Sequence, residues 1–289
     1  MRPFYSPLRY PGGKNCIYSF MAALIHENGL DGCSYAEPFA GGAGLALHLL
    51  ADGIVSEVYL NDLDKSIYFF WDAVLNRTED FCDWINNVPV TMDTWIWAKN
   101  IYNNVDSSEP YELAKATFFL NRSNVSGIIK GGPIGGPLQR GKYKIGARFN
   151  KDDLIQRIIE IKTFRKNIHL SSLDGVEFLK KLNRKRKPIF IYIDPPYVKK
   201  GADLYMNFFD ERHHLELRNQ ILKLRKDWLI SYDDADLIRE LYPTMEKYIY
   251  SLSQCTSNRI GDELIILGDS IHCDEALKYL KNIKYLTSE

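Results

Sequence analysis

The chain has 289 residues, of which 45% are hydrophobic and 26% are charged, and its formal net charge is zero. These proportions are typical of a globular protein, and no apolar run approaches the roughly 20 residues that a membrane-spanning helix needs. Because the chain is not basic overall, any surface that binds nucleic acid must be local.

The first residues do not resemble a signal peptide, so we expect a cytoplasmic protein. The cysteines are odd in number and form no Cys-x-x-Cys pair, which indicates reduced thiols. The sequence therefore predicts neither a disulfide framework nor a zinc site. The five cysteines are residues 16, 33, 82, 255 and 273.

A sharp turn at Pro11-Gly12-Gly13 precedes Lys14. Apolar residues at helical spacing follow over residues 17–25, so Lys14 opens a predicted helix. A lysine at a helix start opposes the helix dipole, which suggests that it pairs with a carboxylate of a ligand. A solvated lysine in the first helical turn is the alternative.

A predicted strand over residues 33–37 is followed by a glycine-rich turn over 38–44 and a helix over 45–50. Glycines allow the backbone to approach a ligand closely, and the start of a helix offers free N–H groups. This order of elements predicts a nucleotide-type pocket. The spacing differs from G-x-G-x-x-G, which counts against a nicotinamide dinucleotide.

The next predicted strand, residues 57–61, is followed by Asp62. An acidic residue at the end of this strand, about 20 residues beyond the glycine turn, is placed to bind ribose hydroxyls. Alternatively, Asp62 and Asp64 cap the helix that is predicted over residues 65–75.

The alternation of strands and helices stops between residues 76 and 164. Helices are predicted around residues 80–86, 92–103 and 112–121. The tryptophans in or next to this region are expected in a small helical core rather than on a stacking platform. They are residues 71, 84, 95 and 97.

Residues 121–151 are rich in glycine and contain no aspartate or glutamate. A stretch of one charge sign inside a neutral protein fits a loop or hairpin that lies on a phosphate backbone, with arginine and asparagine available for base edges. A flexible, solvated loop is the alternative. The residues expected to bind nucleic acid are Arg122, Asn124, Lys130, Arg140, Lys142, Lys144 and Arg148.

Strands and helices alternate again from residue 167. Asp174 follows a short strand over residues 167–170 and could reach the base of a ligand. The loop that contains Gly201, Tyr205 and Phe208 is a candidate lid over the pocket. His213 and His214 begin a helix and are predicted to be structural. Further elements are a helix over 175–183 and strands over 188–193, 227–232, 247–253 and 263–267, the last two joined by residues 257–262.

The apolar run over residues 188–193 predicts a buried parallel strand, and Asp194-Pro195-Pro196-Tyr197 follows it. The prolines end the strand because they cannot donate hydrogen bonds to a neighbour. The tetrapeptide therefore lies at the carboxyl edge of the sheet, where open α/β sheets bind ligands. A plain strand exit with a surface aspartate is the alternative.

These residue types suit the activation of an exocyclic amine on a heteroaromatic ring, whose lone pair is delocalised into the ring. Asp194 and the carbonyl of Pro195 could each accept one N–H, which draws the nitrogen toward tetrahedral geometry and frees its lone pair. Tyr197 could stack on the ring. No covalent intermediate is needed.

In this order, the stretches resemble the Dam-type family of DNA adenine-N6 methyltransferases over nearly the whole chain. Tyr10-Pro11-Gly12-Gly13-Lys14 resembles the opening of the family, which more often has Trp-Ala at the first two positions. Residues 37–44 resemble its S-adenosylmethionine loop, Asn61-Asp62 its ribose-binding acid, residues 121–151 its target-recognition hairpin, and the tetrapeptide its catalytic site.

The resemblance implies an α/β, Rossmann-like sheet of seven mostly parallel strands. Residues 1–75 and 165–289 would form the catalytic domain, and residues 76–164 an inserted target-recognition domain. It also implies S-adenosyl-L-methionine as the cofactor, no metal, double-stranded DNA with a flipped adenine, and a protein of bacterial or phage type. It allows a separate restriction endonuclease as a partner. Asp194, Pro195 and Tyr197 would be catalytic. The expected cofactor-binding residues are Tyr10, Lys14, Glu37, Phe39, Ala40, Gly41, Gly42, Gly44, Asp62, Asp174 and Asp194.

Other functions stay open from the sequence alone. The same tetrapeptide could methylate cytosine N4 or an RNA base, or the fold could serve a DNA-binding protein without activity. A protein glutamine methyltransferase is expected to carry Asn in place of Asp194. The basic stretch does not closely copy the family members that read GATC, so the target sequence is undetermined.

Overall fold

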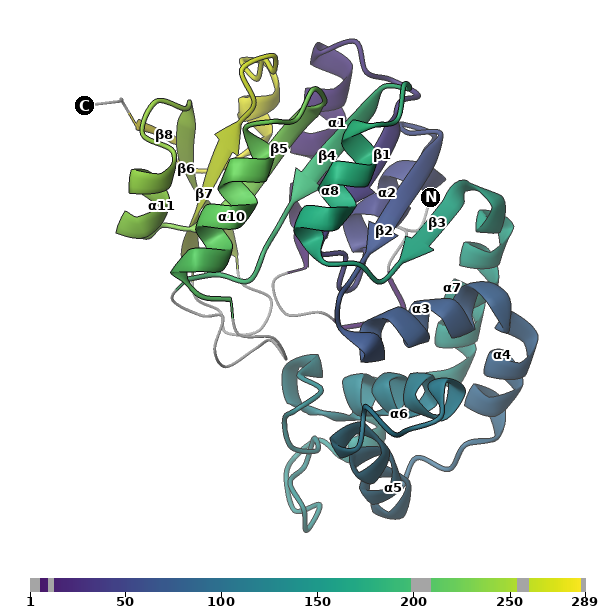
Figure 1. Ribbon diagram of the computed structural model, residues 1–289. Helices are drawn as coiled ribbons and strands as arrows, with labels where there is room; N and C mark the ends of the chain where they lie inside the picture. Colours follow the sequence, from purple (N-terminus) through teal and green to yellow (C-terminus); the bar gives the residue numbers. More distant parts are fainter. Residues whose placement is uncertain (1–5, 10–12, 199–208, 254–259, 287–289) are drawn as a thin grey trace.

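The computed structural model describes residues 6–9, 13–198, 209–253 and 260–286. Its strands form one eight-stranded sheet in the order β3-β2-β1-β4-β5-β7-β6-β8, with helices on both faces (Figure 1). None of the helices within these ranges is both long and apolar enough to cross a membrane.

Neighbouring strands are parallel in one half of the sheet and antiparallel in the other. The parallel half contains β3 (Ile168–Ser171), β2 (Glu57–Asn61), β1 (Ser34–Glu37), β4 (Ile189–Ile193) and β5 (Asp227–Asp233). The antiparallel half adds β7 (Ile260–Leu267), β6 (Lys247–Ser253) and β8 (Lys284–Leu286).

The Rossmann-like α/β prediction is confirmed, and two of its details are corrected. The sheet has an eighth strand, β8, whose three residues are too few to give a periodic pattern. Strand β7 begins at Ile260, so residues 260–262 extend the strand rather than the turn before it.

Both faces of the sheet are buried, which explains the continuous apolar run of β4. Ile189, Ile191 and Ile193 belong to one apolar cluster, whereas Phe190 and Tyr192 belong to the other. The isoleucine face is covered by α8 (Gly175–Asn183), α10 (Glu211–Ile221) and α11 (Asp236–Leu241). The opposite face is covered by η1 (Lys14–Ile17), α1 (Tyr18–Glu27), α2 (Gly44–Ala51) and η5 (Ala276–Tyr279).

The second apolar cluster continues from the sheet into the helices of the middle region. Phe70, Phe81, Phe118 and Phe149 pack together there through edge-to-face and stacked contacts. Trp71 is fully buried in the cluster and the other three predicted tryptophans pack against it, so the expected helical core is confirmed. These helices are α3 (Lys65–Asn76), α4 (Thr78–Asn87), α5 (Met92–Asn103), α6 (Pro110–Ser123) and α7 (Lys151–Thr163), followed by η4 (Arg165–Asn167).

The sequence analysis missed α7 and α11. Leu154, Ile158 and Ile161 are buried at helical spacing on α7, and the side chain of Asn150 caps its first turn by accepting from Asp153 N. The pattern was present but directly follows the basic stretch. Helix α11 has only six residues, which is too short for a clear periodic signal.

Candidate active site

The candidate site lies at the carboxyl edge of the parallel strands. Strand β4 is buried along its whole length and ends at Ile193, so that Asp194 emerges between β1 and β5. Pro195 and Pro196 are buried, whereas Asp194 is partly exposed. The strand thus delivers a carboxylate to the edge of the sheet, as the sequence predicts.

Two groups hold the carboxylate of Asp194 from behind. The hydroxyl of Ser231 on β5 donates to Oδ1 at 2.9 Å, and the ammonium of Lys14 lies 3.1 Å from the same oxygen. Ser231 also lies 2.8 Å from the hydroxyl of Tyr192. A serine hydroxyl has one proton, and Ser231 gives it to Asp194, so Tyr192 must donate to Ser231.

Both contacts of Asp194 reach Oδ1. Within the described part of the chain, its Oδ2 has no hydrogen-bond or ion-pair partner, and 23% of the side chain is exposed. The carboxylate is therefore anchored through one oxygen and can offer the other to a ligand.

Lys14 is buried, with only 5% of its side chain exposed. Besides Asp194, its ammonium donates to the hydroxyl of Tyr197 at 2.5 Å and lies 3.3 Å from Oε2 of Glu263. The charge of this lysine at the helix start is thus neutralised by two carboxylates of the protein. The sequence had suggested a carboxylate of a ligand as its partner.

Tyr197 lies with its ring 4.9 Å from the ammonium of Lys14 and packs against the isoleucine-face cluster. Burial and the nearby carboxylate of Asp194 raise the pKa of its hydroxyl well above the ordinary value, so the group stays neutral. The next residue is fixed as well, since the amide of Val198 donates to Oδ1 of Asp233.

The glycine-rich turn after β1 is held in an unusual backbone conformation. Gly41 and Ala43 both have φ of 47°, in the left-handed region that is unfavourable for an alanine. The indole of Trp71 donates to the carbonyl of Gly41 at 2.8 Å and fixes the turn from below. Trp71 was predicted to be a core residue, and its indole also supports this turn.

Glu37 lies at the end of β1 and is buried. Desolvation and the charge of Asp194 raise the pKa of its carboxyl, the hydrogen bond from the hydroxyl of Tyr35 lowers it, and the net pKa is about 8. At neutral pH the carboxyl of Glu37 is therefore largely protonated.

Asp62 follows β2 and joins the glycine turn to the next helix. Its Oδ2 accepts from the amide of Gly41 at 2.8 Å, and its Oδ1 accepts from the amide of Asp64. Burial and the neighbouring Asp64 raise the pKa of Asp62 to about 7. Of the two proposed capping residues, it is Asp64 that caps α3, by accepting from the amide of Ser66.

Phe39 and Asp174 meet at the start of α8. A Cβ on Gly175 would lie 2.7 Å from the ring of Phe39, so glycine is required for this close approach. Asp174 is exposed, but its Oδ1 accepts from the amides of Val176 and Glu177 and caps the helix. A structural role for Asp174 thus accompanies the predicted contact with a ligand base.

Two parts of the expected site fall outside the described residues: Tyr10, and the candidate lid with Gly201, Tyr205 and Phe208. The predicted structural role of the two histidines is confirmed by the hydrogen bonds of both side chains. His213 forms a capping box with Asp210, and His214 is buried against the hydroxyl of Tyr232.

Comparison with known proteins decides the family. The family model described as D12 class N6 adenine-specific DNA methyltransferase matches residues 10–257. The chain belongs to this family. It is 24% identical over 245 residues to the type II methyltransferase M.CviBI of Paramecium bursaria Chlorella virus NC1A, covering 81% of this chain and 87% of that protein.

A solved structure described as a conserved hypothetical protein of Streptococcus pyogenes aligns with 87% of this chain and 96% of that chain. The two are 11% identical with a TM-score of 0.34, a similarity too low to say anything about fold or function. The family match makes this D12-class chain an adenine-specific DNA methyltransferase.

In this D12-class enzyme, the basic stretch forms an irregular loop with η2 (Val125–Gly127), η3 (Ile145–Arg148) and one isolated bridge between Asn124 and Pro133. Asn124 is fully buried. Its amide nitrogen donates to three loop carbonyls, and its oxygen accepts from the indole of Trp95. The expectation that Asn124 reads base edges is therefore corrected, because all of its polar atoms hold the loop together.

Arg9 lies beside this loop, although it precedes the family's opening motif. Its amide donates to Asn121 Oδ1 and its carbonyl accepts from Asn121 Nδ2. Gly127, with φ of 78°, packs so closely that a Cβ would lie 2.2 Å from the carbonyl oxygen of Arg9. The sequence analysis missed Arg9 because no local pattern marks it.

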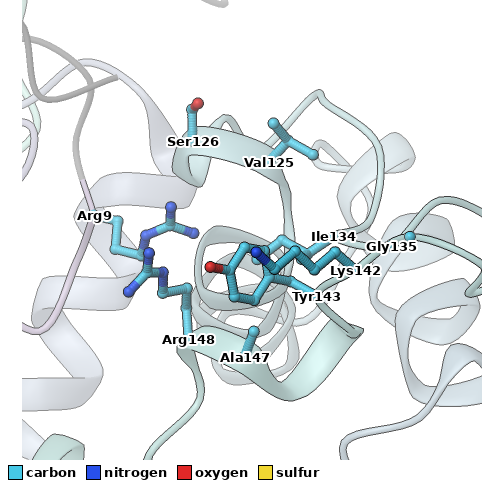
Figure 2. Close-up of a pocket in the computed structure, with 10 residues that line it drawn as sticks. Arg9, Val125, Ser126, Ile134, Gly135, Lys142, Tyr143, Ala147 and Arg148 are labelled. Atoms are coloured by element: carbon cyan, nitrogen blue, oxygen red, sulfur yellow. The ribbon is translucent and has the colours of Figure 1, made fainter. Parts of the chain in front are cut away.

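A cavity of about 350 Å³ opens between Arg9 and the basic loop (Figure 2). Arg9, Lys142 and Arg148 line it with Tyr143, whose side chain is exposed, and none of the described residues that line it is acidic. Burial and the neighbouring charges of Arg9, Arg157 and Arg148 together lower the pKa of Arg122 to about 9, although the carboxylate of Asp153 raises it. The positive charge gathered here would be stabilised by an anion.

The remaining predicted basic residues differ in their surroundings. Arg122 is half-buried and donates to the carbonyl of Arg148, so it adds positive charge below the loop surface rather than an exposed contact. Lys144 is exposed and donates to the carbonyl of Gln139. Lys130, Arg140 and Lys142 are also exposed.

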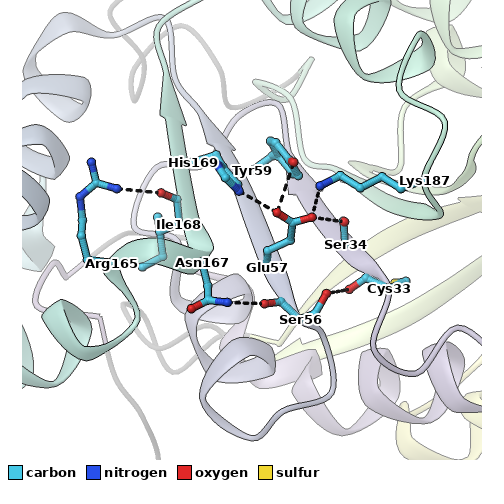
Figure 3. A network of polar contacts seen from close by, with 10 residues as sticks. All are labelled: Cys33, Ser34, Ser56, Glu57, Tyr59, Arg165, Asn167, Ile168, His169 and Lys187. Atoms are coloured by element: carbon cyan, nitrogen blue, oxygen red, sulfur yellow. Dashed lines mark hydrogen bonds and ion pairs between the residues drawn. The ribbon is translucent and has the colours of Figure 1, made fainter.

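A second cluster of charged residues lies at the amino edge of the same sheet (Figure 3). Glu57 on β2 accepts from the hydroxyls of Ser34 and Tyr59 and pairs with Lys187 and His169. Lys187 lies just before the start of β4. Burial alone would raise the pKa of Glu57, but its hydrogen bonds lower it to about 2.

Proposed function

We propose that this adenine-specific DNA methyltransferase transfers the methyl group of S-adenosyl-L-methionine to N6 of an adenine that is flipped out of the duplex. The observation that carries the proposal is the half-anchored carboxylate of Asp194, with Oδ1 fixed and Oδ2 without a partner in the described structure. It stands at the edge of the sheet beside the glycine turn, since its charge acts on the buried carboxyl of Glu37.

The residues of the tetrapeptide act on the target amine. Asp194 Oδ2 and the carbonyl of Pro195 each accept one N–H of N6, and the ring of Tyr197 stacks on the adenine. The lone pair of N6 then forms the new N–C bond as the C–S bond breaks, and the displaced N6 proton is released to solvent. Unstacking the adenine costs a few kcal/mol, which contacts in the pocket offset.

The residues around the glycine turn fit the proposed cofactor, which when bound supplies an activated methyl group on a sulfonium. Asp62 is a partly buried carboxylate whose pKa is raised, and ribose hydroxyls are donors that would stabilise its charged form. The first amides of α2 follow Ala43, which has no polar side chain to cap them. The proposed cofactor residues are Lys14, Glu37, Phe39, Ala40, Gly41, Gly42, Gly44, Asp62, Asp174 and Asp194, with Tyr10 from outside the described residues.

The proposed DNA interface is the cavity at Arg9 together with the exposed cations of the basic loop. Phosphodiester groups suit these residues because Arg9, Lys142 and Arg148 line the cavity and no acidic side chain is among its described lining residues. The proposed DNA-binding residues are Arg9, Lys130, Arg140, Lys142, Lys144 and Arg148, with Arg122 adding charge from below. A separate restriction endonuclease stays a prediction, supported by the name of the viral relative as a type II enzyme.

The catalytic assignment is tested with Asp194→Ala. We expect the variant to form no N6-methyladenine in DNA, measured by mass spectrometry of the nucleosides, while its Tm and its affinity for S-adenosylmethionine stay near those of the native protein. Asp106→Ala is the control, because Asp106 is exposed on the surface and, within the described ranges, forms an ion pair with Lys65 alone. Appreciable N6-methyladenine from Asp194→Ala would refute the assignment.

The DNA interface is tested by the salt dependence of binding. Replacing Arg140, Lys142 and Lys144 by glutamine should lower the slope of log Kd against log salt by about 0.9 for each phosphate that the variant no longer neutralises. The control replaces Lys181, Arg184 and Arg186, which are exposed near the amino edge and remove the same charge. Equal slopes for the two triple variants would contradict the proposed interface.

A further inference from the structure

Glu263 lies in the site without being part of any predicted motif. It stands on β7 between Asp233 of β5 and Tyr250 of β6. Only 10% of its side chain is exposed, and the residue lies beyond the 10–257 segment that the family model matches. A buried carboxylate needs partners to be stable, so its contacts indicate what it does.

The contacts of Glu263 connect the antiparallel half of the sheet to the catalytic tetrapeptide. The hydroxyl of Tyr250 donates to its Oε2 at 3.0 Å. The ammonium of Lys14 lies 3.3 Å from Oε2 and donates to Oε1 at 3.4 Å. Tyr250 thus holds Glu263, and Glu263 in turn pairs with Lys14.

Lys14 in turn holds both functional side chains of the tetrapeptide. Among the described residues, the ammonium of Lys14 contacts Oδ1 of Asp194, the hydroxyl of Tyr197 and the carboxylate of Glu263. The position of this one nitrogen therefore fixes the orientation of the carboxylate and the ring that would meet the adenine.

The charges explain why a second carboxylate is useful here. With Asp194 as its only anion, a buried ammonium would pair closely with that carboxylate and weaken it as an acceptor for the target amine. Glu263 shares the ammonium, at 3.3 Å against 3.1 Å for Asp194. Lys14 can then anchor Oδ1 without drawing Oδ2 away from the substrate.

We propose that Glu263 is a positioning residue for methyl transfer, which acts through Lys14 on Asp194 and Tyr197. The proposal rests on the proposed function of Asp194. It adds to the reaction a residue of the antiparallel strands, 249 positions from Lys14 in the sequence.

A double-mutant cycle tests the proposal. The rate of a single turnover is measured at saturating DNA and S-adenosylmethionine for the native protein, Glu263→Gln, Lys14→Gln and the double variant. We expect Glu263→Gln to lower the rate about 10-fold to 100-fold, because the carboxylate and ring lose their alignment. The double variant should be no slower than Lys14→Gln alone, because Glu263 acts only through Lys14.

The controls separate positioning from folding. Glu263→Gln keeps the size of the side chain, and thermal unfolding should show each variant folded at the assay temperature. Asp262→Asn, at the exposed neighbouring position that accepts from Ser251, should keep the native rate. A native rate for Glu263→Gln, or rate reductions that multiply in the double variant, would overturn the proposal.

The outcome is also distinguished from a failure of the proposed function. If Asp194→Ala keeps its activity in the same assay, the catalytic assignment is wrong and so is the role of Glu263. If Asp194→Ala is inactive while Glu263→Gln keeps the native rate, only the inference about Glu263 is wrong.

Discussion

At each edge of the sheet a lysine pairs with carboxylate side chains, but the carboxylates at the two edges differ in how many of their oxygens have partners. At the amino edge, Glu57 receives two hydroxyls, Lys187 and His169, so both of its oxygens are taken. At the carboxyl edge, the ammonium of Lys14 pairs with both Asp194 and Glu263. Among the described residues, Lys14 and Ser231 both contact Asp194 through Oδ1. A carboxylate whose two oxygens both have protein partners stabilises the fold, whereas one with an oxygen left for a ligand can bind a substrate.

The surroundings of the two clusters differ in the same way. The amino-edge cluster joins Ser34 of β1, Glu57 of β2 and His169 of β3 to the residue Lys187 that lies just before β4. It thus ties the starts of four strands together. The carboxyl-edge cluster joins residues at the ends of strands to the start of η1, where a ligand can approach.

The largest effect expected from this comparison concerns Ser231. Ser231→Ala removes one of the two anchors of Asp194 Oδ1, and we expect the single-turnover rate to fall about 10-fold to 100-fold because the carboxylate can rotate. The measurement is the methyl-transfer rate well below the Tm, since the buried hydroxyl of Tyr192 also loses its acceptor.

Tyr192→Phe is the matched control for this change. It removes the donor behind Ser231 but leaves the bond from Ser231 to Asp194, so the rate should fall much less than in Ser231→Ala. Equal reductions of the rate in the two variants would show that the anchor on Oδ1 has no special importance.

The amino edge should respond in stability and not in rate. Glu57→Gln removes the charge that pairs with Lys187 and His169, and we expect the free energy of unfolding to fall by about 1–3 kcal/mol. The rate of methyl transfer should stay native. Urea unfolding measures the free energy of unfolding, and the single-turnover assay measures the rate of methyl transfer. A large fall in this rate would contradict the purely structural role of the amino-edge cluster.

A smaller effect concerns the pH dependence of this stabilisation. The pKa of Glu57 is lowered from 4.5 to about 2 in the folded state, so its contribution is fully present above pH 4.5 and is lost as the pH falls toward 2. The difference in unfolding free energy between the native protein and Glu57→Gln should therefore shrink as the pH falls from 4.5 toward 2. A difference that grows on acidification would contradict the assigned pairing.

The sequence by itself determined the local features of this protein. Strand β2 lies at the predicted residues, and β4 ends where two prolines follow it. The glycine turn precedes α2, and Asp62 follows β2, as their order in the chain indicates. Such features depend on side-chain alternation, turn residues and helix caps within a few positions, and the chain shows these directly.

The tertiary structure alone decided which distant groups meet. Strand β7 inserts between β5 and β6, and this order brings Glu263 to Lys14. The fold also buries Asn124, which was predicted from the sequence to bind DNA, and it places Arg9 at the basic cavity. These outcomes depend on burial and on pairing between residues far apart in the chain, so no pattern of neighbouring residues could reveal them.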